Sequence, residues 1–378
     1  MSAVVLGWAL RTSLGATVDA VIARVLAGSR SDDRRAVGAA APSRHGRFLA
    51  RLPLLALEAA HEAVAQAGVT GITGITDITG MPGMPGGDRI GVFAGVGGLR
   101  IEWSELRPAL ERQREDGEHA WTSGLDRIHP FWMLKNLSNN GHALLAADLG
   151  ARGEGSTFGG ATAGAQALTA ASRALAANVI DVAVVVAYDT LLAPQVIGDP
   201  GERGAPYGDA AEDARPGEAA AAVVLARAGH GLVRVTAASV ADGQPDEPRD
   251  ATIARVVARV CPANRGAGTV AVDGAARGLR GDAGERVAIA AAVGPEAPLV
   301  AIASATGALG AATAIVQTIV LGELLRRGVL PPIAGLARAA AGPLRPLVRE
   351  EAFAGRVALG VSTGAPGLAA AVCVEAMP

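Results

Sequence analysis

Cysteine, lysine and aromatic residues are scarce in this sequence of 378 residues. It has two cysteines, one lysine at Lys135, and 3% aromatic side chains. Cys261 and Cys373 stand in apolar surroundings, VVARVCPAN and AAAVCVEAMP, where a thiol behaves as a small hydrophobe, so neither suggests a disulfide framework. The six histidines are scattered, without His-x-x-x-His spacing, and Cys-x-x-Cys spacing is also absent. We therefore expect no metal site and no cofactor.

A dominant charge and a long apolar run are also missing. The formal net charge is -2, with acidic and basic residues mixed along the chain, so no basic face for nucleic acid and no polybasic membrane anchor is expected. No uninterrupted apolar run is long enough to span a bilayer, and the start MSAVVLGWALRTSLG lacks a basic segment and a convincing cleavage site. We expect a cytoplasmic protein without nucleic-acid or membrane partners.

Half of the residues are apolar, which is enough for a large core and for two or three domain-sized units. Strands and helices are predicted to alternate in the first half of the chain. Thr17 opens a helix that Gly28 ends, and the Gly- and Pro-rich segment 70–88 is expected to be a surface loop. The other predicted elements are strands at 3–6, 90–94, 182–187 and 219–225, and a helix at 53–67.

The second half repeats this scheme. Strands are predicted at 232–238, 269–272 and 299–303, with a paired couple at 357–360 and 368–374; helices are predicted around 253–260 and at 311–325. Alternating strands and helices favour mostly parallel sheets covered by helices. Because the scheme occurs twice, we expect two similar halves in a helix, sheet, helix, sheet, helix sandwich.

The stretch STFGGATAGAQALTAASRALAANVIDVAVVVA, residues 156–187, has the pattern of a turn that holds a nucleophile at a helix start. Small residues from Gly159 to Ala165 lead into a helical run, and a β-branched run follows at 182–186. The tip of this turn, however, is alanine.

The ordered motifs resemble those of the β-ketoacyl synthases, enzymes of the thiolase-like fold. The opening 3–30 is similar to their first strand, turn and helix, DRIGVFAGVGG to their second strand and glycine turn, and RPGEAAAAVVLARA to their GEGA strand. GDAGERVAIAAAVG, which begins at Gly281, is similar to the acidic helix after the first active-site histidine. The resemblance implies a thiolase-like five-layer αβαβα sandwich, with an N-terminal half at 1–230 and a C-terminal half at 231–378.

The resemblance fails at the catalytic positions. Aligning GGATAGAQAL with the family pattern TACASGAQAL puts Ala161 on the nucleophilic cysteine. VAVDGAARG stands where the family has EAHGTGT, with Asp273 at the first histidine, and IASATGALGAAT stands for KSNIGHTLGAAG, with Gly307 at the second. Alanine forms no thioester, and a carboxylate repels a developing enolate. These positions are therefore predicted to be degenerate, with no catalytic residue among them.

The closing loop FGFGGTNA, whose phenylalanines gate the tunnel in the family, reads TGAPGLAA here. Thr363 and Ala365 replace the gate, while Gly364 and Gly367 remain. A shift of one residue would bring Thr162 to the turn tip, but a hydroxyl nucleophile needs a base, and no histidine stands near Asp273 or Gly307. Loss at four special places beside intact scaffold motifs favours a pseudoenzyme.

This combination is similar to the chain length factors of type II polyketide systems. The resemblance implies a heterodimer with a cysteine-containing ketosynthase, contact with an acyl carrier protein through that complex, and a tunnel-shaping role in polyketide or polyene biosynthesis. Chain length factors often have glutamine at the nucleophile position, where this chain has alanine. The alternatives are an active acyltransferase or malonyl decarboxylase with a rearranged site, and a structural homodimer without a ketosynthase partner.

Much of the scarce aromatic content falls between residues 100 and 135, where the family has dimer interface and tunnel wall. In a helix from Leu99 to Leu110, one face would carry Trp103, Leu106 and Leu110. We predict tunnel or interface roles for these three residues and for Phe131, Trp132 and Met133, with ordinary packing as the alternative.

Overall fold

The computed structural model describes residues 2–30, 37–68, 86–101, 103–117, 124–193, 206–208, 215–243, 247–261, 270–276, 278–364 and 367–378. Its strands are β1 (Ser2–Thr12), β2 (Ile90–Val96), β3 (Ser156–Gly159), β4 (Val182–Thr190), β5 (Glu218–Ala226), β6 (Val233–Asp242), β7 (Val270–Asp273), β8 (Pro298–Val300), β9 (Val329–Leu330), β10 (Arg345–Pro346), β11 (Glu351–Ala352), β12 (Val357–Thr363) and β13 (Leu368–Ala376). Its helices are α1 (Val18–Leu26), α2 (Arg51–Gln66), α3 (Trp103–Asp116), α5 (Trp132–Lys135), α6 (Asn140–Asp148), α7 (Ala163–Ala176), α8 (Arg249–Val260), α9 (Leu279–Val293), α10 (Ile302–Thr306) and α11 (Thr313–Arg327).

The order of the strands contains an internal repeat. Within the described residues, eleven strands form one hydrogen-bonded sheet in the order β10-β8-β7-β12-β13-β6-β1-β5-β4-β2-β3. The run β1-β5-β4-β2-β3 and the run β6-β13-β12-β7-β8 have the same pattern, with two antiparallel pairs followed by two parallel pairs. The antiparallel pair β1–β6 joins the two runs. The prediction of two similar halves is therefore confirmed.

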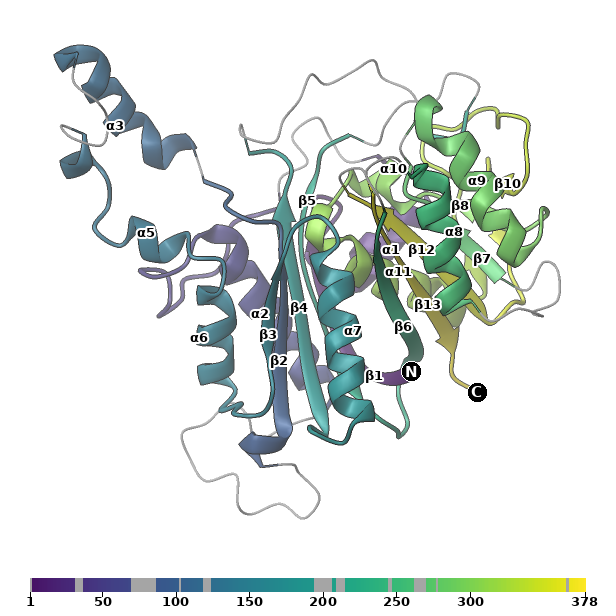
Figure 1. Cartoon of the computed structure of the whole chain (residues 1–378), viewed down its shortest axis with the longest axis horizontal. Helices are drawn as coiled ribbons and strands as arrows, with labels where there is room; N and C mark the ends of the chain where they lie inside the picture. The colour runs from purple at the N-terminus through teal and green to yellow at the C-terminus, as the bar shows by residue number, and fades with distance from the viewer. Residues whose placement is uncertain are drawn as a thin grey trace.

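Five layers follow from how the helices cover these runs (Figure 1). Helices α2 and α6 pack on the outer face of the first run, and α8 packs on the outer face of the second, with α9 against it. Between the runs lie α7 and α11, which contact each other and strands of both runs. Alternate residues of each strand face opposite layers, as the pleat requires, so the chain is the predicted thiolase-like sandwich.

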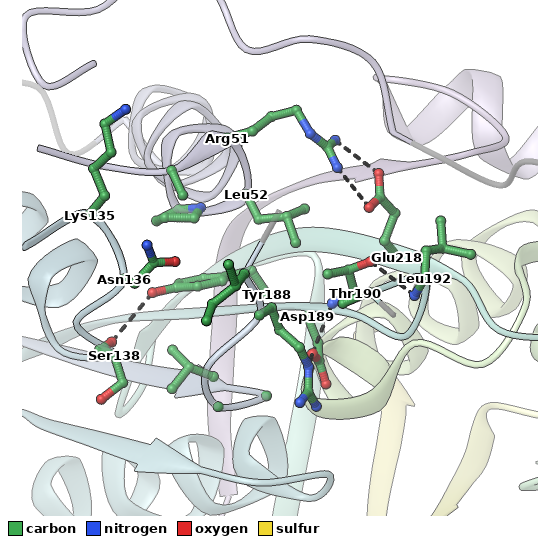
Figure 2. Close-up of a pocket in the computed structure, with 18 of the residues that line it drawn as sticks. Arg51, Leu52, Lys135, Asn136, Ser138, Tyr188, Asp189, Thr190, Leu192 and Glu218 are labelled. Atoms are coloured by element: carbon green, nitrogen blue, oxygen red, sulfur yellow. Dashed lines mark hydrogen bonds and ion pairs between the residues drawn. The ribbon is translucent and has the colours of Figure 1, made fainter. Parts of the chain in front are cut away.

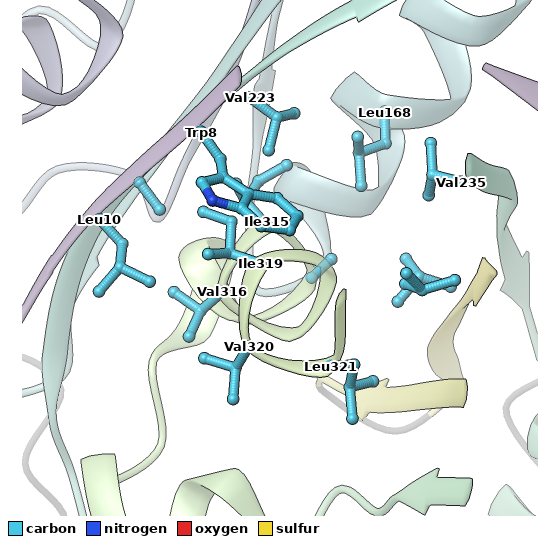
Figure 3. Close-up of a cluster of buried hydrophobic side chains, with 14 of the residues drawn as sticks. Trp8, Leu10, Leu168, Val223, Val235, Ile315, Val316, Ile319, Val320 and Leu321 are labelled. Atoms are coloured by element: carbon cyan, nitrogen blue, oxygen red, sulfur yellow. The ribbon is translucent and has the colours of Figure 1, made fainter. Parts of the chain in front are cut away.

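The largest core cluster lies in the central layer. Trp8 of β1 packs there with Ile315 and Ile319 of α11, Leu168 of α7 and Val235 of β6 (Figure 3). Alternate residues of β5 face opposite cores. Val223 packs in the central core, whereas Ala222 and Val224 pack in the outer core. This packing holds the amino-terminal ends of α7 and α11 close together, as their contacts with the turn at 310–312 show.

Two predicted strand boundaries are wrong. Strand β1 runs to Thr12 rather than ending at Leu6, because Gly7 interrupts the apolar pattern without ending the strand. A Cβ atom on Gly7 would lie 2.2 Å from the carbonyl oxygen of Ala63, so this glycine lets α2 pack closely on the strand. Strand β8 ends at Val300 rather than at Ala303, since the chain turns into α10 at Ile302.

Other predicted elements agree with the structure to within a few residues. Thr17 caps α1, and its hydroxyl accepts a hydrogen bond of 3.3 Å from the amide of Ala20. The predicted loop at 70–88 lies mostly outside the described residues. The described helices include none that is both long and apolar enough to cross a membrane. The division at residue 230 stays a prediction.

Candidate functional site

Four distant segments meet at one cavity of about 260 Å³. Its wall includes Ala161, which follows β3, Asp273 at the end of β7, Gly307 after α10, and Thr363 and Gly364 at the end of β12. Parallel pairing of β7 and β12 brings their carboxyl ends to the same edge of the sheet. The structure therefore places the predicted degenerate positions around a single space.

Ala161 presents only a methyl group at the start of α7. Gly160 before it has a φ of +104°, a backbone conformation that favours glycine, and the helix begins two residues later at Ala163. The next residue, Thr162, is buried, its hydroxyl accepts a hydrogen bond of 3.3 Å from Gln166, and it does not line the cavity. The geometry thus offers no support for Thr162 as the nucleophile.

Asp273 is a buried carboxyl with two fixed donors. Its Oδ1 accepts a 2.7 Å hydrogen bond from the amide of Ile302, and its Oδ2 accepts a 2.8 Å hydrogen bond from Nε2 of Gln317. Burial raises the pKa of this carboxyl to about 7, against the lowering effect of these two hydrogen bonds. Asp273 therefore ties α10 and α11 to β7, whereas a histidine there would offer a ring N–H to the cavity.

Gly307 has no room for a side chain. It ends α10 with a φ of +80°, and a Cβ atom at this position would lie 2.9 Å from the carbonyl oxygen of Arg215 and 3.1 Å from Gly217. Both the backbone conformation and the close neighbours exclude a histidine without a shift of the surrounding chain.

Gly364, directly after β12, lies against Ala161. The amide of Gly364 donates a 3.0 Å hydrogen bond to the carbonyl of Leu368, and a Cβ atom on Gly364 would lie 3.1 Å from that of Ala161. Gly367 has a φ of +85° and accepts a hydrogen bond from the amide of Gly243. Ala365, the other predicted gate residue, lies outside the described residues.

Comparison with known proteins identifies the fold and the family. The chain matches the family described as "Beta-ketoacyl synthase, N-terminal domain" over residues 8–230. The chain belongs to the β-ketoacyl synthase family. No curated protein sequence matches it.

Solved structures of this family resemble the chain over its whole length. A β-ketoacyl synthase from Burkholderia phymatum STM815 has a TM-score of 0.78 and 18% identity, covering 100% of this chain and 99% of that one. The ishigamide ketosynthase/chain length factor has a TM-score of 0.76, 18% identity and the same two coverages. The AntDE:AntF complex, a type II polyketide acyl-carrier protein with its ketosynthase bound to the hexaketide, has a TM-score of 0.70 and 15% identity, covering 100% and 99%. These low identities show the shared fold alone.

An ion pair that the sequence did not predict lines the cavity at Ala161 in this β-ketoacyl synthase family member. Nε of Arg100 donates a 2.9 Å hydrogen bond to Oδ1 of Asp189, at the end of β4. Burial raises the pKa of Asp189, opposed by Arg100 and by the amide of Ala311. The two residues are 89 positions apart, and neither stands in one of the quoted family motifs, so no sequence signal linked them.

A second hydrogen-bonded group that the sequence did not predict lies beside the turn that follows Asp273. Tyr207 is buried with a φ of 62°; its hydroxyl bonds to Glu285 at 3.2 Å and accepts a 2.9 Å hydrogen bond from the amide of Ala276. Burial raises the pKa of Glu285 to about 8, although the amide of Ala275 donates to it. This network orders the turn that follows Asp273. The acidic helix from Gly281 was the only sequence signal for it.

A larger cavity of about 430 Å³ lies next to the first (Figure 2). Arg51 of α2 and Glu218 of β5 form a two-bond ion pair at its wall, with N···O distances of 2.9 and 2.8 Å. Tyr188 and Ser138 also line this wall. The hydroxyl of Tyr188 donates a 3.4 Å hydrogen bond to the carbonyl of Ser138. The rest of the wall is mixed, with apolar side chains such as Leu52 and the polar groups of Lys135, Asn136 and Thr190.

Of the predicted tunnel and interface residues, those whose side chains the structure describes do not line this cavity. Helix α3 forms as expected, although it begins at Trp103 rather than Leu99; the side chain of Trp103 lies outside the described part. Leu106 and Leu110 are half-buried, and Trp132 is buried. Phe131 and Met133 are 42% and 67% exposed. From this region the cavity wall takes Ile101, Ser104, Lys135, Asn136, Leu137 and Ser138 instead.

Proposed function

We propose that the chain is a non-condensing subunit that pairs with an active ketosynthase and shapes its acyl tunnel in polyketide biosynthesis. The observation that carries this proposal is the single cavity at which Ala161, Asp273 and Gly307 meet. A Claisen condensation on this fold needs a thiolate to hold the acyl group and donors to stabilise the carbanion left by decarboxylation. Ala161 supplies no thiolate, Gly307 has no side chain, and both carboxyl oxygens of Asp273 are already engaged by the amide of Ile302 and by Gln317.

The outer edge of the sheet at β3 supports association with a partner. Strand β3 ends the eleven-strand order, so its outer edge is unpaired among the described residues. Unpaired backbone N–H and C=O groups on such a strand favour addition of a strand from another chain.

Apolar side chains surround this edge. Leu99 and Leu137 are 54% and 48% exposed and line an open depression of about 810 Å³ together with Ser156, Thr157 and Gly159 from β3 and its end. Phe131 and Met133 add exposed apolar area from the segment just before Leu137. Apolar side chains clustered beside a free strand edge fit a protein interface better than a solvated face.

The partner we propose is a cysteine-containing ketosynthase, which would supply the chemistry that this chain lacks. The comparison structures include an assembly named as a ketosynthase/chain length factor and one of a ketosynthase with its acyl-carrier protein. We extend these two relationships to this chain as a proposal, with contact to the carrier protein made through the complex.

Intact-protein mass spectrometry tests the absence of acyl transfer. The purified chain is incubated with malonyl- and acyl-loaded carrier protein, and its mass and the release of CO₂ are recorded. We expect no acyl adduct and no decarboxylation. An adduct, or CO₂ release that persists after removal of contaminating synthase, would instead support the acyltransferase or decarboxylase alternative.

Ala161→Cys sharpens this experiment. The new thiol would stand at the start of α7 and could accept an acyl group, but condensation should stay absent, because Gly307 has no side chain and both oxygens of Asp273 are held by Ile302 and Gln317 rather than by a substrate. Condensation by this variant alone would contradict the assignment of the degenerate site.

A further inference from the structure

The two cavities share one wall. Arg100 and Asp189 line both the 430 Å³ cavity and the 260 Å³ cavity at Ala161. Just after Asp189, neighbouring residues line different cavities: Leu191 lines the smaller one and Leu192 lines the larger one. The ion pair therefore stands between the two spaces.

Asp189 is the fixed half of this wall. Apart from Arg100, its carboxylate accepts a 2.8 Å hydrogen bond from the amide of Thr190 and a 3.0 Å hydrogen bond from the amide of Ala311. A Cβ atom on Gly97 would lie 1.8 Å from Oδ1, and one on Gly310 would lie 2.0 Å from Oδ2. The backbone thus encloses this carboxylate from two sides.

Arg100 is the less enclosed half of this wall. It lies in the short segment between β2 and α3, outside regular secondary structure, and Gly98 just before it has a φ of +104°. Its side chain is 22% exposed, whereas that of Asp189 is fully buried. If the guanidinium turns toward solvent, Asp189 keeps its two backbone donors, which lowers the cost of the change.

We propose that Arg100 separates the two cavities, so that an acyl chain bound in the 430 Å³ cavity stops at this side chain. When Arg100 is displaced, the acyl chain can extend into the cavity at Ala161. The inference rests on the proposed function, because it takes an acyl chain as the ligand. Apolar residues such as Val37, Leu52 and Val96 in the larger cavity can cover methylene groups. With a methyl group at Ala161, the smaller cavity offers an acyl chain space without a reactive thiol.

Binding of neutral acyl N-acetylcysteamine thioesters of graded chain length to the isolated chain tests this partition. Affinity should rise about fourfold for each methylene group that enters the cavity and then level off at the length the cavity holds. We expect Arg100→Ala to move this limit to chains several methylene groups longer. Adding Ala161→Met, which fills the smaller cavity, should return the limit to the wild-type length.

Arg89→Ala is the matched control, because it removes another Arg–Asp pair, with Asp181, at a place that lines neither cavity. Its length limit should equal that of the wild type. If Arg100→Ala does not fold, Arg100→Ala with Asp189→Asn avoids a buried unpaired charge and is used in its place, with circular dichroism as the folding check.

Equal length limits for the wild type and a folded Arg100 variant would overturn the proposal, and so would the absence of wild-type binding at every length. The measurement needs no ketosynthase. A shifted limit therefore supports the partition even if the chain forms no heterodimer, so failure of the proposed function is distinguished from failure of the partition.

Discussion

Gly307, which we align with the family's second histidine, is a residue whose backbone does not suit a side chain. Its positive φ and its neighbours, the carbonyl of Arg215 and the backbone of Gly217, leave no room for a Cβ atom. A histidine there would need a different turn after α10, so the backbone agrees with our prediction that the family's second histidine is absent at this position.

Gly307→Ala should therefore lower the free energy of unfolding by about 2 to 3 kcal/mol, the usual effect of a strained backbone with a steric clash. Gly38→Ala is the control, because a Cβ atom there meets nothing within 4 Å and its φ is not positive, and it should change stability by less than about 0.5 kcal/mol. Urea denaturation measures both. Equal stabilities for the two variants would show that the turn tolerates a side chain.

Asp273 should make stability depend on pH. Burial raises its folded-state pKa from 3.8 to about 7, so between these values the native state holds a proton that the unfolded state has released. The stability of the wild type relative to Asp273→Asn should therefore fall as pH rises from about 4 to about 7, by about 4 kcal/mol at most, and stay constant above. Urea denaturation of both proteins at several pH values checks this.

Glu285, whose pKa is raised to about 8 mainly by burial and in small part by the charge of Asp273, titrates in both proteins, so the difference between them reports Asp273 together with this weak coupling. A difference that is constant from pH 4 to pH 8 would mean that the carboxyl is not buried as described.

Motif spacing placed Ala161, Asp273 and Gly307 well enough that the structure brings them to one cavity. It could not give the φ of Gly307, because a glycine in a sequence does not show which conformation its turn needs. The Arg100–Asp189 pair was also out of reach, since a contact between residues 89 positions apart depends on how β2 and β4 pair.

At the scale of elements, α3 is the helix that departs most from the compact sandwich. Figure 1 shows it reaching outward beyond the strand edge on the side of β3. Leu106 and Leu110 remain half-buried on it, as the predicted apolar face requires, whereas Arg107 is exposed. Such a helix is well placed to meet a partner.

We propose that this face of α3 meets the tunnel of a partner ketosynthase, so Leu106→Ala in the complex should remove bulk there and lengthen the product while leaving the early condensations unchanged. Liquid chromatography with mass spectrometry gives the product distribution, and the melting temperature is recorded on the same samples. Arg107→Ala on the exposed face of α3 is the control and should leave the distribution unchanged. An unchanged distribution from a folded Leu106→Ala complex would contradict this role, and a loss of about 2 to 5 kcal/mol would point to ordinary packing.

Element types followed from periodicity more reliably than element ends did. The β-branched run at 182–186 predicted β4 because a fully buried strand reads as continuous apolar residues. The end of β1 was misread at Gly7, where the glycine serves the close approach of α2 and not a turn. Where a strand ends depends on the elements that pack against it, and a local sequence pattern does not show which elements those are.

At the scale of the whole molecule, two strand runs of the same order enclose a shared central layer, and among the described residues the eleven-strand order ends at β3 on one side and at β10 on the other. The internal repeat was predictable because the alternation of strands and helices occurs twice along the chain. The pairing of β1 with β6 was not predictable, because the sequence of a strand indicates which of its residues are buried but not which strand lies beside it. The free edge at β3 and the apolar residues around it are the features that a partner would cover.

The most direct test of the central claim is co-expression of this chain with a cysteine-containing ketosynthase, followed by size-exclusion chromatography and an assay with malonyl-loaded carrier protein. We predict a one-to-one complex in which acyl groups are found on the ketosynthase alone and in which product forms only when both chains are present. Exposed charges introduced at Leu99 and Leu137, beside β3, should abolish the complex while each chain stays folded. A stable monomer or homodimer of this chain that ignores the ketosynthase, or product formation by this chain alone, would contradict the account.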